Sequence, residues 1–134
     1  SASDTEYGWP WYNELVGAYF KNHPEQQNAT VRVYDKTFPA TSHLPEEWSM
    51  KEEWYNFRNT YWDKVNVLLT LDEKTMRGGG NGDFHPLAWY RDFDGGRSFY
   101  TAIGHRDETF ADTAYQKHLL GGIQYAIGNK TSKN

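Results

Sequence analysis

The sequence contains no cysteine, and this absence excludes two kinds of explanation. Without thiols the chain can form no disulfide framework, an arrangement compatible with the cytoplasm and with many secreted bacterial proteins. Chemistry that depends on a cysteine nucleophile is likewise excluded for this polypeptide.

The sequence also lacks a basic excess and any long apolar run. The formal net charge is -4 and the isoelectric point is near 5.7, which argues against a nucleic-acid partner because polyanion binding needs a basic surface. There is no run of about eighteen apolar residues and no basic start followed by an apolar stretch, so neither a membrane span nor a signal peptide is visible. We expect an extracellular or periplasmic bacterial protein, with the cytoplasm left open.

Aromatic residues are abundant in this chain. They make up 17% of its 134 residues, with six Trp and ten Tyr, while the mean hydropathy is only -0.91. The length favours one domain with a modest core. Most of the aromatic rings are simplest to interpret as core, whereas partly exposed ones are suited to stacking on the C–H faces of sugar rings.

Residues 85–108 combine a hairpin signal with ionisable side chains. Residues 85–91 and 98–103 have strand-like patterns, and Asp94-Gly95 between them is typical of a tight turn that needs positive φ. The second run ends at Gly104-His105-Arg106-Asp107-Glu108. An imidazole beside carboxylates at a strand end is typical of a functional site, because a carboxylate holds one imidazole tautomer. A solvated polar loop is the alternative interpretation.

The spacing of apolar residues predicts the elements before this hairpin. It favours a helix from Pro10 to Phe20 or Lys21, a half-buried strand at residues 29–35 and a strand deep in a sheet at residues 64–71. Residues 49–57 carry conflicting signals, a helix capping box followed by an aromatic run typical of a strand. The glycines of residues 76–83 predict a surface loop, since the Gly-Lys-Ser/Thr ending of a phosphate loop is missing.

A closing helix is predicted from Asp112 or Thr113 to Gly128. Its Gly121-Gly122 pair costs helix propensity and indicates close packing on the sheet. We expect residues 129–134 to form a disordered tail. The side chains predicted to be buried are Ala114, Leu119, Leu120, Ile123 and Ile127.

Several short motifs follow one another in a fixed order along the chain. They are Ala2-Ser3-Asp4-Thr5-Glu6-Tyr7, Trp9-Pro10-Trp11-Tyr12, His23-Pro24, His43-Leu44-Pro45, Glu53-Trp54-Tyr55-Asn56-Phe57, His85-Pro86-x-Ala88-Trp89, Asp94-Gly95-Gly96-Arg97 and Gly104-His105. Together they resemble ThuA-like domains, a family named for trehalose utilisation, over residues 1–128.

The resemblance implies a particular α/β fold. We expect part of a flavodoxin-like, class I glutamine-amidotransferase-like three-layer sheet, closed by a C-terminal β-hairpin and helix, in one domain over residues 1–128. It also favours a strand over a helix at residues 54–57. In the family, several β/α units precede the segment matched by residues 1–7, including the turn where amidotransferases carry their cysteine. We therefore expect either a missing upstream segment or a homodimer that completes the sheet edges.

The resemblance also implies a set of site residues. It places Gly104-His105-x-x-Glu108 where the superfamily has its catalytic His and Glu. In an enzyme we would expect His105 to act as general acid or base, oriented by Glu108 or Asp107. The residues expected to bind substrate are Asp4, Glu6, Tyr7, Trp9, Trp11, Tyr55, His85 and Trp89.

A metal ion is a minority alternative for this site. His85 and His105 come to the same end of the predicted hairpin and, with Glu108, Asp4 or Glu6, offer ligand types that suit zinc and related ions. No helical His-x-x-x-His motif supports such a site, so the expectation is no cofactor. His23 and His118 are interpreted as structural or solvent-facing.

Three functions remain open from the sequence. The first is an enzyme of carbohydrate utilisation, a hydrolase or isomerase of a sugar derivative with a His/carboxylate site. The second is a noncatalytic carbohydrate-binding module that uses exposed members of the set Trp9, Trp11, Trp48, Trp54 and Trp62. The third is an assembly domain completed by a second copy.

Overall fold

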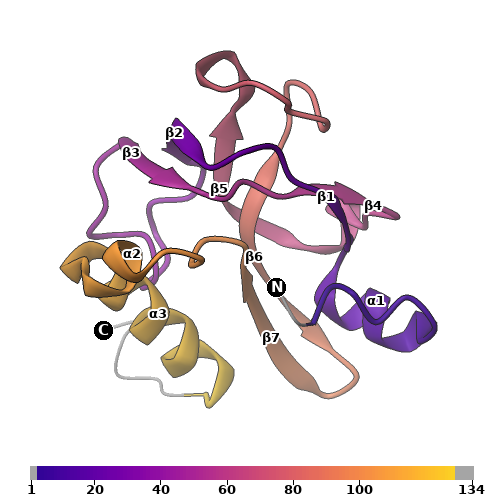
Figure 1. The fold of residues 1–134 in the computed structure, drawn as a ribbon. Coiled ribbons are helices and arrows are strands. Elements are labelled where there is room, and N and C mark those ends of the chain that lie inside the picture. The colour runs from indigo at the N-terminus through magenta and orange to yellow at the C-terminus, as the bar shows by residue number, and fades with distance from the viewer. Residues whose placement is uncertain (1–2, 129–134) are drawn as a thin grey trace.

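A curled five-stranded sheet forms the framework of the chain (Figure 1). The protein is described from a computed structural model, of which residues 3–128 are described here. The predicted tail at residues 129–134 lies outside the described residues. The strand order is β3-β2-β5-β6-β7, and a separate small sheet pairs β1 with β4. The elements are α1 (Pro10–Val16), β1 (Tyr19–Asn22), β2 (Gln27–Val33), β3 (Glu47–Glu52), β4 (Asn56–Arg58), η1 (Trp62–Lys64), β5 (Asn66–Asp72), η2 (Glu73–Thr75), β6 (Pro86–Phe93), β7 (Gly96–Thr101), α2 (Asp107–Ala111) and α3 (Thr113–Ala126).

The sheet confirms the α/β class but differs from the expected parallel layout. All pairings between the described strands are antiparallel, whereas a flavodoxin-like sheet is built from parallel strands. As predicted, β5 lies in the middle of the sheet, where its buried Leu68 and Leu69 face opposite sides. Residues 49–52 and 56–58 are strand, whereas residues 53–55 belong to neither a helix nor a strand. The helix signal was therefore wrong, and the strand expected at residues 54–57 is confirmed only for residues 56 and 57.

The β6–β7 hairpin has the predicted two-residue turn. Asp94 and Gly95 have φ angles of 51° and 82°, and Phe93 pairs with Gly96 on either side of them. Positive φ at both central residues is the requirement of a type I′ turn, whose twist matches that of the flanking strands. This hairpin carries the chain back across the molecule to Gly104 and His105.

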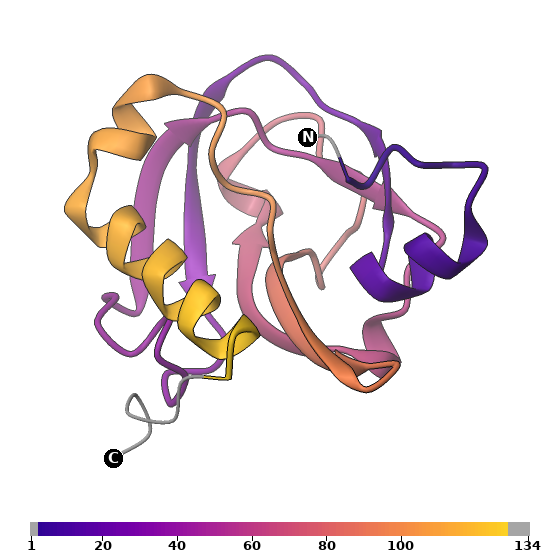
Figure 2. The same ribbon diagram turned by 90° about the horizontal axis from the view of Figure 1, so that it is seen from below.

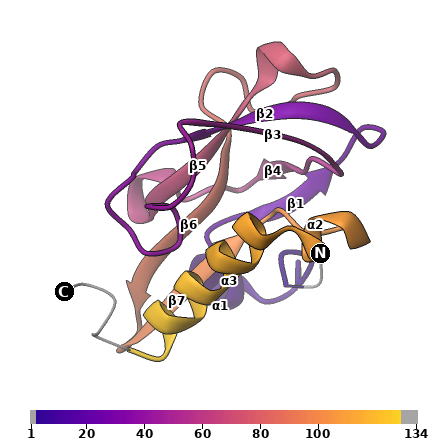
Figure 3. The same cartoon turned by 90° about the vertical axis from the view of Figure 1, so that its left-hand side faces the viewer.

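The helices lie on opposite sides of this framework (Figures 1 and 2). α2 and α3 are on one side and α1 is on the other, and both α1 and α3 contact β7. Figure 3, turned to bring α3 toward the viewer, shows this helix running alongside the long hairpin. The core between these elements is rich in aromatic rings, with Trp54, Trp89 and Tyr115 all fully buried.

The first helix is shorter than predicted. It ends at Val16 because Gly17 adopts a left-handed conformation with φ of 105°, and a Cβ there would lie 2.7 Å from Nε1 of Trp89. Tyr19 and Phe20, assigned to the helix by their spacing, belong instead to β1, where they pair with β4. The predicted helix was too long because these two aromatic residues of a short strand continue the helical spacing of the apolar residues before them.

The buried face of α3 also differs from the prediction. Leu120, Ile123 and Ile127 are 53%, 57% and 73% exposed, and the helix buries Tyr115, His118 and the glycine pair instead. The close packing expected of the glycines is confirmed, since a Cβ on Gly121 would lie 2.5 Å from the backbone nitrogen of Ala40. Asp112 caps the helix by accepting a hydrogen bond from the Ala114 amide.

His118 is a structural histidine, as expected. Its Nδ1 lies 2.9 Å from the Ala40 carbonyl oxygen and its Nε2 lies 3.0 Å from the Thr101 hydroxyl. Burial lowers the pKa of His118 to about 4, so the ring is neutral at pH 7, donating to the carbonyl and accepting from the hydroxyl. Within residues 3–128, no helix has both the length and the apolar character that crossing a bilayer requires.

We expect Gly121→Ala to lower the free energy of unfolding by roughly 1–3 kcal/mol, because overpacking against Ala40 outweighs a gain in helix propensity of about 1 kcal/mol. Urea denaturation measures the change. Leu120→Ala, at the neighbouring exposed position, is the matched control and should change stability by less than about 0.5 kcal/mol. A Gly121→Ala variant as stable as the wild type would contradict close packing.

Candidate functional site

The buried carboxylate of Glu52 fixes the loop that carries His105. Glu52 ends β3 and is fully buried. Its oxygens accept hydrogen bonds from the backbone amides of His105 at 3.0 Å and Arg106 at 3.1 Å, from the Glu53 amide and from the Thr109 hydroxyl. A buried carboxylate is tolerated only when donors replace its hydration. The end of β3 and the segment after β7 are thereby joined.

The next residue, Glu53, faces two imidazole rings. One carboxylate oxygen lies 3.5 Å from Nδ1 of His105, and the other lies 3.6 Å from Nε2 of His23. The Glu53 side chain is 13% exposed, whereas those of His105 and His23 are 45% and 40% exposed. The carboxylate therefore lies behind two accessible rings, an arrangement that can fix the orientation of an imidazole.

Tyr55 adds a third contact to Glu53. Burial, together with the nearby negative charge of Glu53, raises the pKa of Tyr55 to about 12. The ring also packs edge-on against Phe20. The phenol therefore stays protonated at neutral pH beside the Glu53 carboxylate.

A partly open cleft of about 340 Å³ adjoins these groups. Tyr55, two residues after Glu53, and Gly104, directly before His105, form part of its wall. The volume lies at the lower end of the range typical of small-molecule sites. Its lining combines aromatic rings, hydroxyls and backbone groups, and consists of Ser3, Tyr55, Phe99, Tyr100, Thr101, Ala102, Ile103, Gly104, Leu119 and Ile123.

Asp4 is a buried carboxylate beside this cleft. Its side chain is 1% exposed, and its Oδ2 accepts a hydrogen bond of 2.5 Å from the hydroxyl of Tyr100, a residue of the cleft wall. Its other oxygen, Oδ1, is buried and has no hydrogen-bond partner among residues 3–128. Burial raises the pKa of Asp4 above its ordinary value of 3.8, although the Tyr100 hydrogen bond opposes the shift.

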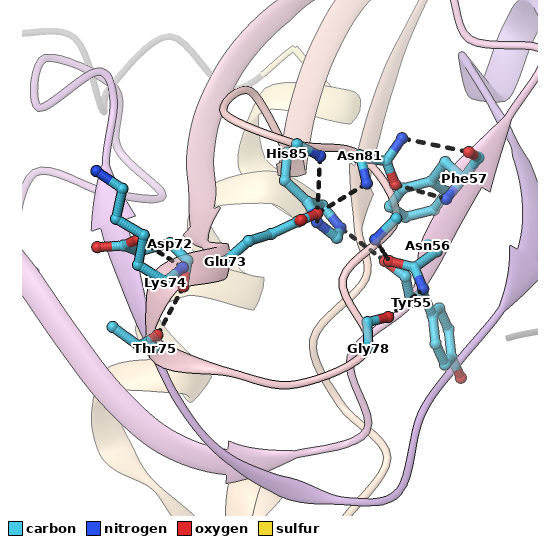
Figure 4. A network of polar contacts seen from close by, with 12 residues as sticks. Tyr55, Asn56, Phe57, Asp72, Glu73, Lys74, Thr75, Gly78, Asn81 and His85 are labelled. Atoms are coloured by element: carbon cyan, nitrogen blue, oxygen red, sulfur yellow. Dashed lines mark hydrogen bonds and ion pairs between the residues drawn. The ribbon is translucent and has the colours of Figure 1, made fainter.

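His85 is a structural residue of the fold and lies behind the site. It is fully buried, with Nδ1 at 2.7 Å from Glu73 and Nε2 at 2.8 Å from the Tyr55 carbonyl oxygen (Figure 4). The same Glu73 oxygen accepts from the Asn81 and Gly82 amides, which fastens the glycine-rich loop. His85 was expected to line the pocket or to bind a metal, but both ring nitrogens are occupied inside the protein.

The carboxylate next to His105 is not one of the two predicted. Glu108 is 73% exposed and pairs with Arg106 at 3.2 Å, and Asp107 is exposed in the first turn of α2. Glu53 occupies the orienting position instead. His23, interpreted from the sequence as structural or solvent-facing, also joins the group. The one sequence signal that could have indicated Glu53 is its place directly before the aromatic run at residues 54–57.

The remaining predicted binding residues are dispersed. Trp89 is buried in the core, where its Nε1 donates to the Val16 carbonyl at 2.6 Å. Trp9 and Trp11 are exposed and stack on one another. Tyr7 and Glu6 are also exposed, and the Tyr7 hydroxyl donates to the Phe20 carbonyl. None of these five is in the wall of the cleft described above.

Comparison with known proteins identifies the family. Residues 1–126 match the family described as ThuA, trehalose utilisation, which is nearly the whole chain. The chain belongs to the ThuA family. The resemblance found in the sequence motifs is therefore confirmed, and the Glu53 group is part of a ThuA domain.

Two solved structures resemble this ThuA domain. A ThuA-like protein from Bacteroides uniformis ATCC 8492 is 25% identical, with a TM-score of 0.75 over 98% of this chain and 56% of that chain. A second, from Parabacteroides merdae ATCC 43184, is 24% identical, with a TM-score of 0.67 over 92% of this chain and 57% of that chain. The chain thus spans a little over half the length of both. No curated protein matches it.

The metal hypothesis finds no support in the ThuA domain. Among residues 3–128, no group of three or more His, Asp or Glu side chains is arranged to hold a metal ion. His85 is engaged by Glu73 and Tyr55, as described above. The ionisable groups at the site are two imidazoles, two tyrosines and the carboxylates of Asp4 and Glu53.

We expect Glu52→Gln to destabilise this ThuA domain by roughly 3 kcal/mol or more, because the amide group places an N–H against backbone N–H donors in a buried position. Urea denaturation tests this. Glu47→Gln, on the same strand in an exposed ion pair with Arg32, is the control and should cost less than about 1 kcal/mol. Comparable effects of the two substitutions would show that the buried carboxylate does not fix the loop.

A second prediction concerns pH and Asp4. Because its folded-state pKa is raised above 3.8, the wild type loses stability as pH rises from about 4 through the folded pKa. Asp4→Asn removes this titration, so its stability relative to the wild type should increase over that window and then level off. Urea denaturation between pH 4 and pH 8 measures the difference. A difference that stays constant or shrinks as pH rises would refute the assignment.

Proposed function

We propose that this ThuA domain binds a sugar or sugar derivative in the cleft and transfers protons on it through His105, held by Glu53. The observation that carries the proposal is that one Glu53 carboxylate faces both His105 and His23. Family membership supports a role in carbohydrate utilisation in general. The reaction itself is inferred from the geometry.

His105 has the features of a general acid or base. Its Nδ1 faces Glu53 at 3.5 Å, which leaves Nε2 as the nitrogen that exchanges a proton with substrate. The carboxylate stabilises the imidazolium formed when Nε2 accepts a proton, as in other carboxylate-imidazole pairs. Because His105 is half exposed and follows Gly104 of the cleft wall, a ligand can reach it.

The cleft wall suits a carbohydrate. Tyr55, Phe99 and Tyr100 supply aromatic rings, and Ser3 and Thr101 supply hydroxyls. Aromatic faces stack on the C–H faces of sugar rings, and polar groups between them can bind sugar hydroxyls. Acid-base groups of this kind serve both the hydrolysis and the isomerisation of a sugar derivative, so product analysis must separate the two.

Glu53→Gln is the decisive substitution. We expect it to lower kcat by about 100-fold or more, since the amide cannot stabilise the imidazolium, while Glu108→Gln should leave kcat unchanged because Glu108 pairs with Arg106. Trehalose and a panel of other mono- and disaccharides would be tested in the intact gene product and in this chain, with binding measured by calorimetry and products by chromatography. Circular dichroism controls for folding.

The same experiment separates the alternatives. If the wild type binds a sugar but converts none of the panel, and Glu53→Gln weakens only binding, a noncatalytic carbohydrate-binding module is the better description. Equal losses of activity in Glu53→Gln and Glu108→Gln would show that the wrong carboxylate has been assigned. Failure of the wild type to bind any carbohydrate would remove the proposed function.

A further inference from the structure

The cleft follows the end of β7 and the segment that leads to His105. Six consecutive residues, 99–104, form part of its wall. Because extended chain advances by about 3.3 Å per residue, the wall from Phe99 to Ile103 is roughly 13 Å long. A single pyranose ring is shorter than this. A ligand that fills the cleft is therefore longer than one sugar ring.

The contacts of α3 show which part of the helix lies beside each part of this wall. Near its start, the Tyr115 hydroxyl donates a hydrogen bond of 2.6 Å to the Ile103 carbonyl oxygen. Two turns later, Gly122 lies so close to the Phe99 ring that a Cβ would be 2.3 Å from it. The helix therefore runs antiparallel to the wall, and its later residues are the ones farthest from His105.

The end of the cleft near His105 carries polar side chains. Tyr55 of the wall belongs to this end, because the charge of Glu53, which faces His105, acts on its hydroxyl. Ser3 of the wall belongs to it as well, because the charge of the next residue, Asp4, also acts on Tyr55. Two side chains with hydroxyl groups therefore lie near the imidazole to which we assign proton transfer.

The opposite end of the cleft is apolar. Phe99 forms it on the strand, and Leu119 and Ile123 form it on α3, one helical turn apart. None of these side chains has a polar atom, and Ile123 is 57% exposed. Aliphatic surface left in water beside a cleft is unfavourable and is typical of binding grooves. A second sugar ring would place hydroxyl groups against side chains that offer them no hydrogen bond.

We propose that the sugar derivative bound in the cleft carries an apolar substituent, as an aryl or alkyl glycoside does. The substituent lies against the apolar end, formed by Phe99, Leu119 and Ile123, and the sugar ring lies at the polar end beside His105. This inference rests on the proposed function and names the substrate class of the same site. In ligand pockets, apolar walls cover most of the ligand and a few polar groups fix its orientation. The two ends of this cleft divide these roles.

Matched glycosides test this assignment. Calorimetry with the intact gene product and with this chain would compare the methyl and phenyl glycosides of glucose, galactose and mannose, in both anomers, with a disaccharide of each sugar. For a sugar that is bound, the phenyl glycoside should bind about 10-fold or more tightly than the methyl glycoside, because several more carbon atoms leave water. A disaccharide that binds more tightly than the phenyl glycoside would overturn the inference.

Ile123→Thr is the variant that tests the position of the substituent. It keeps the branched shape of the side chain and makes it polar, so the phenyl preference should fall about threefold or more while the methyl glycoside binds as it does to the wild type. Ile127→Thr is the matched control, because Ile127 is one helical turn further along, 73% exposed and outside the cleft wall. It should change neither affinity. Both positions are exposed, so we expect both variants to fold.

The outcomes separate this inference from the proposed function. If a sugar is bound but its phenyl and methyl glycosides bind equally, the proposed function stands and this inference fails. A phenyl preference that survives in Ile123→Thr, or that falls equally in Ile127→Thr, places the substituent elsewhere and also overturns the inference. If neither a free sugar nor a glycoside binds, the proposed function fails and this inference fails with it.

Discussion

The positions of Glu53 and His105 depend on one buried carboxylate. Glu52 is buried inside the protein, and apart from the Glu53 amide its donors belong to residues 105–109, about fifty positions further along the chain. Because a carboxylate in the interior requires such donors, the strand end and the distant loop cannot separate without a large loss of free energy. Glu53 follows directly and thereby meets His105. Glu52, which fixes the loop, and Glu53, which faces the imidazole, are therefore consecutive residues with different roles.

The antiparallel sheet explains how residues so far apart in sequence converge. β6 and β7 fold back on each other at Asp94-Gly95 and return the chain to Gly104, while β1 and β4 bring the segments around His23 and Tyr55 together. Asp4 is held near these segments by the hydrogen bond that its backbone carbonyl accepts from the Phe20 amide. Four separate stretches therefore supply the site, and each is placed by strand pairing next to it. Such a site is rigid in its frame and partly open at its surface.

Local rules predicted the parts of this fold that depend on local chemistry. The turn at Asp94-Gly95 requires positive φ, and the apolar run of β5 requires burial, so both were recognisable. The helix end at Gly17 was missed because Tyr19 and Phe20 continue the helical period while forming a strand. The role of Glu53 was missed for a different reason. A contact between residues 53 and 105 is a property of tertiary structure, and the nearer Glu108 was the natural choice from the sequence.

The connection of His85 to Tyr55 has a consequence for anyone who modifies the protein. Surface loops rich in glycine usually accept insertions and tags. The loop at residues 76–83 is an exception, because Glu73 holds both its backbone and the imidazole that contacts the Tyr55 carbonyl. Lengthening this loop would therefore disturb the position of Tyr55 in the cleft wall. The turn at Asp94-Gly95 is exposed and lies outside that network of hydrogen bonds. It is therefore the better attachment point for a label or a fused domain.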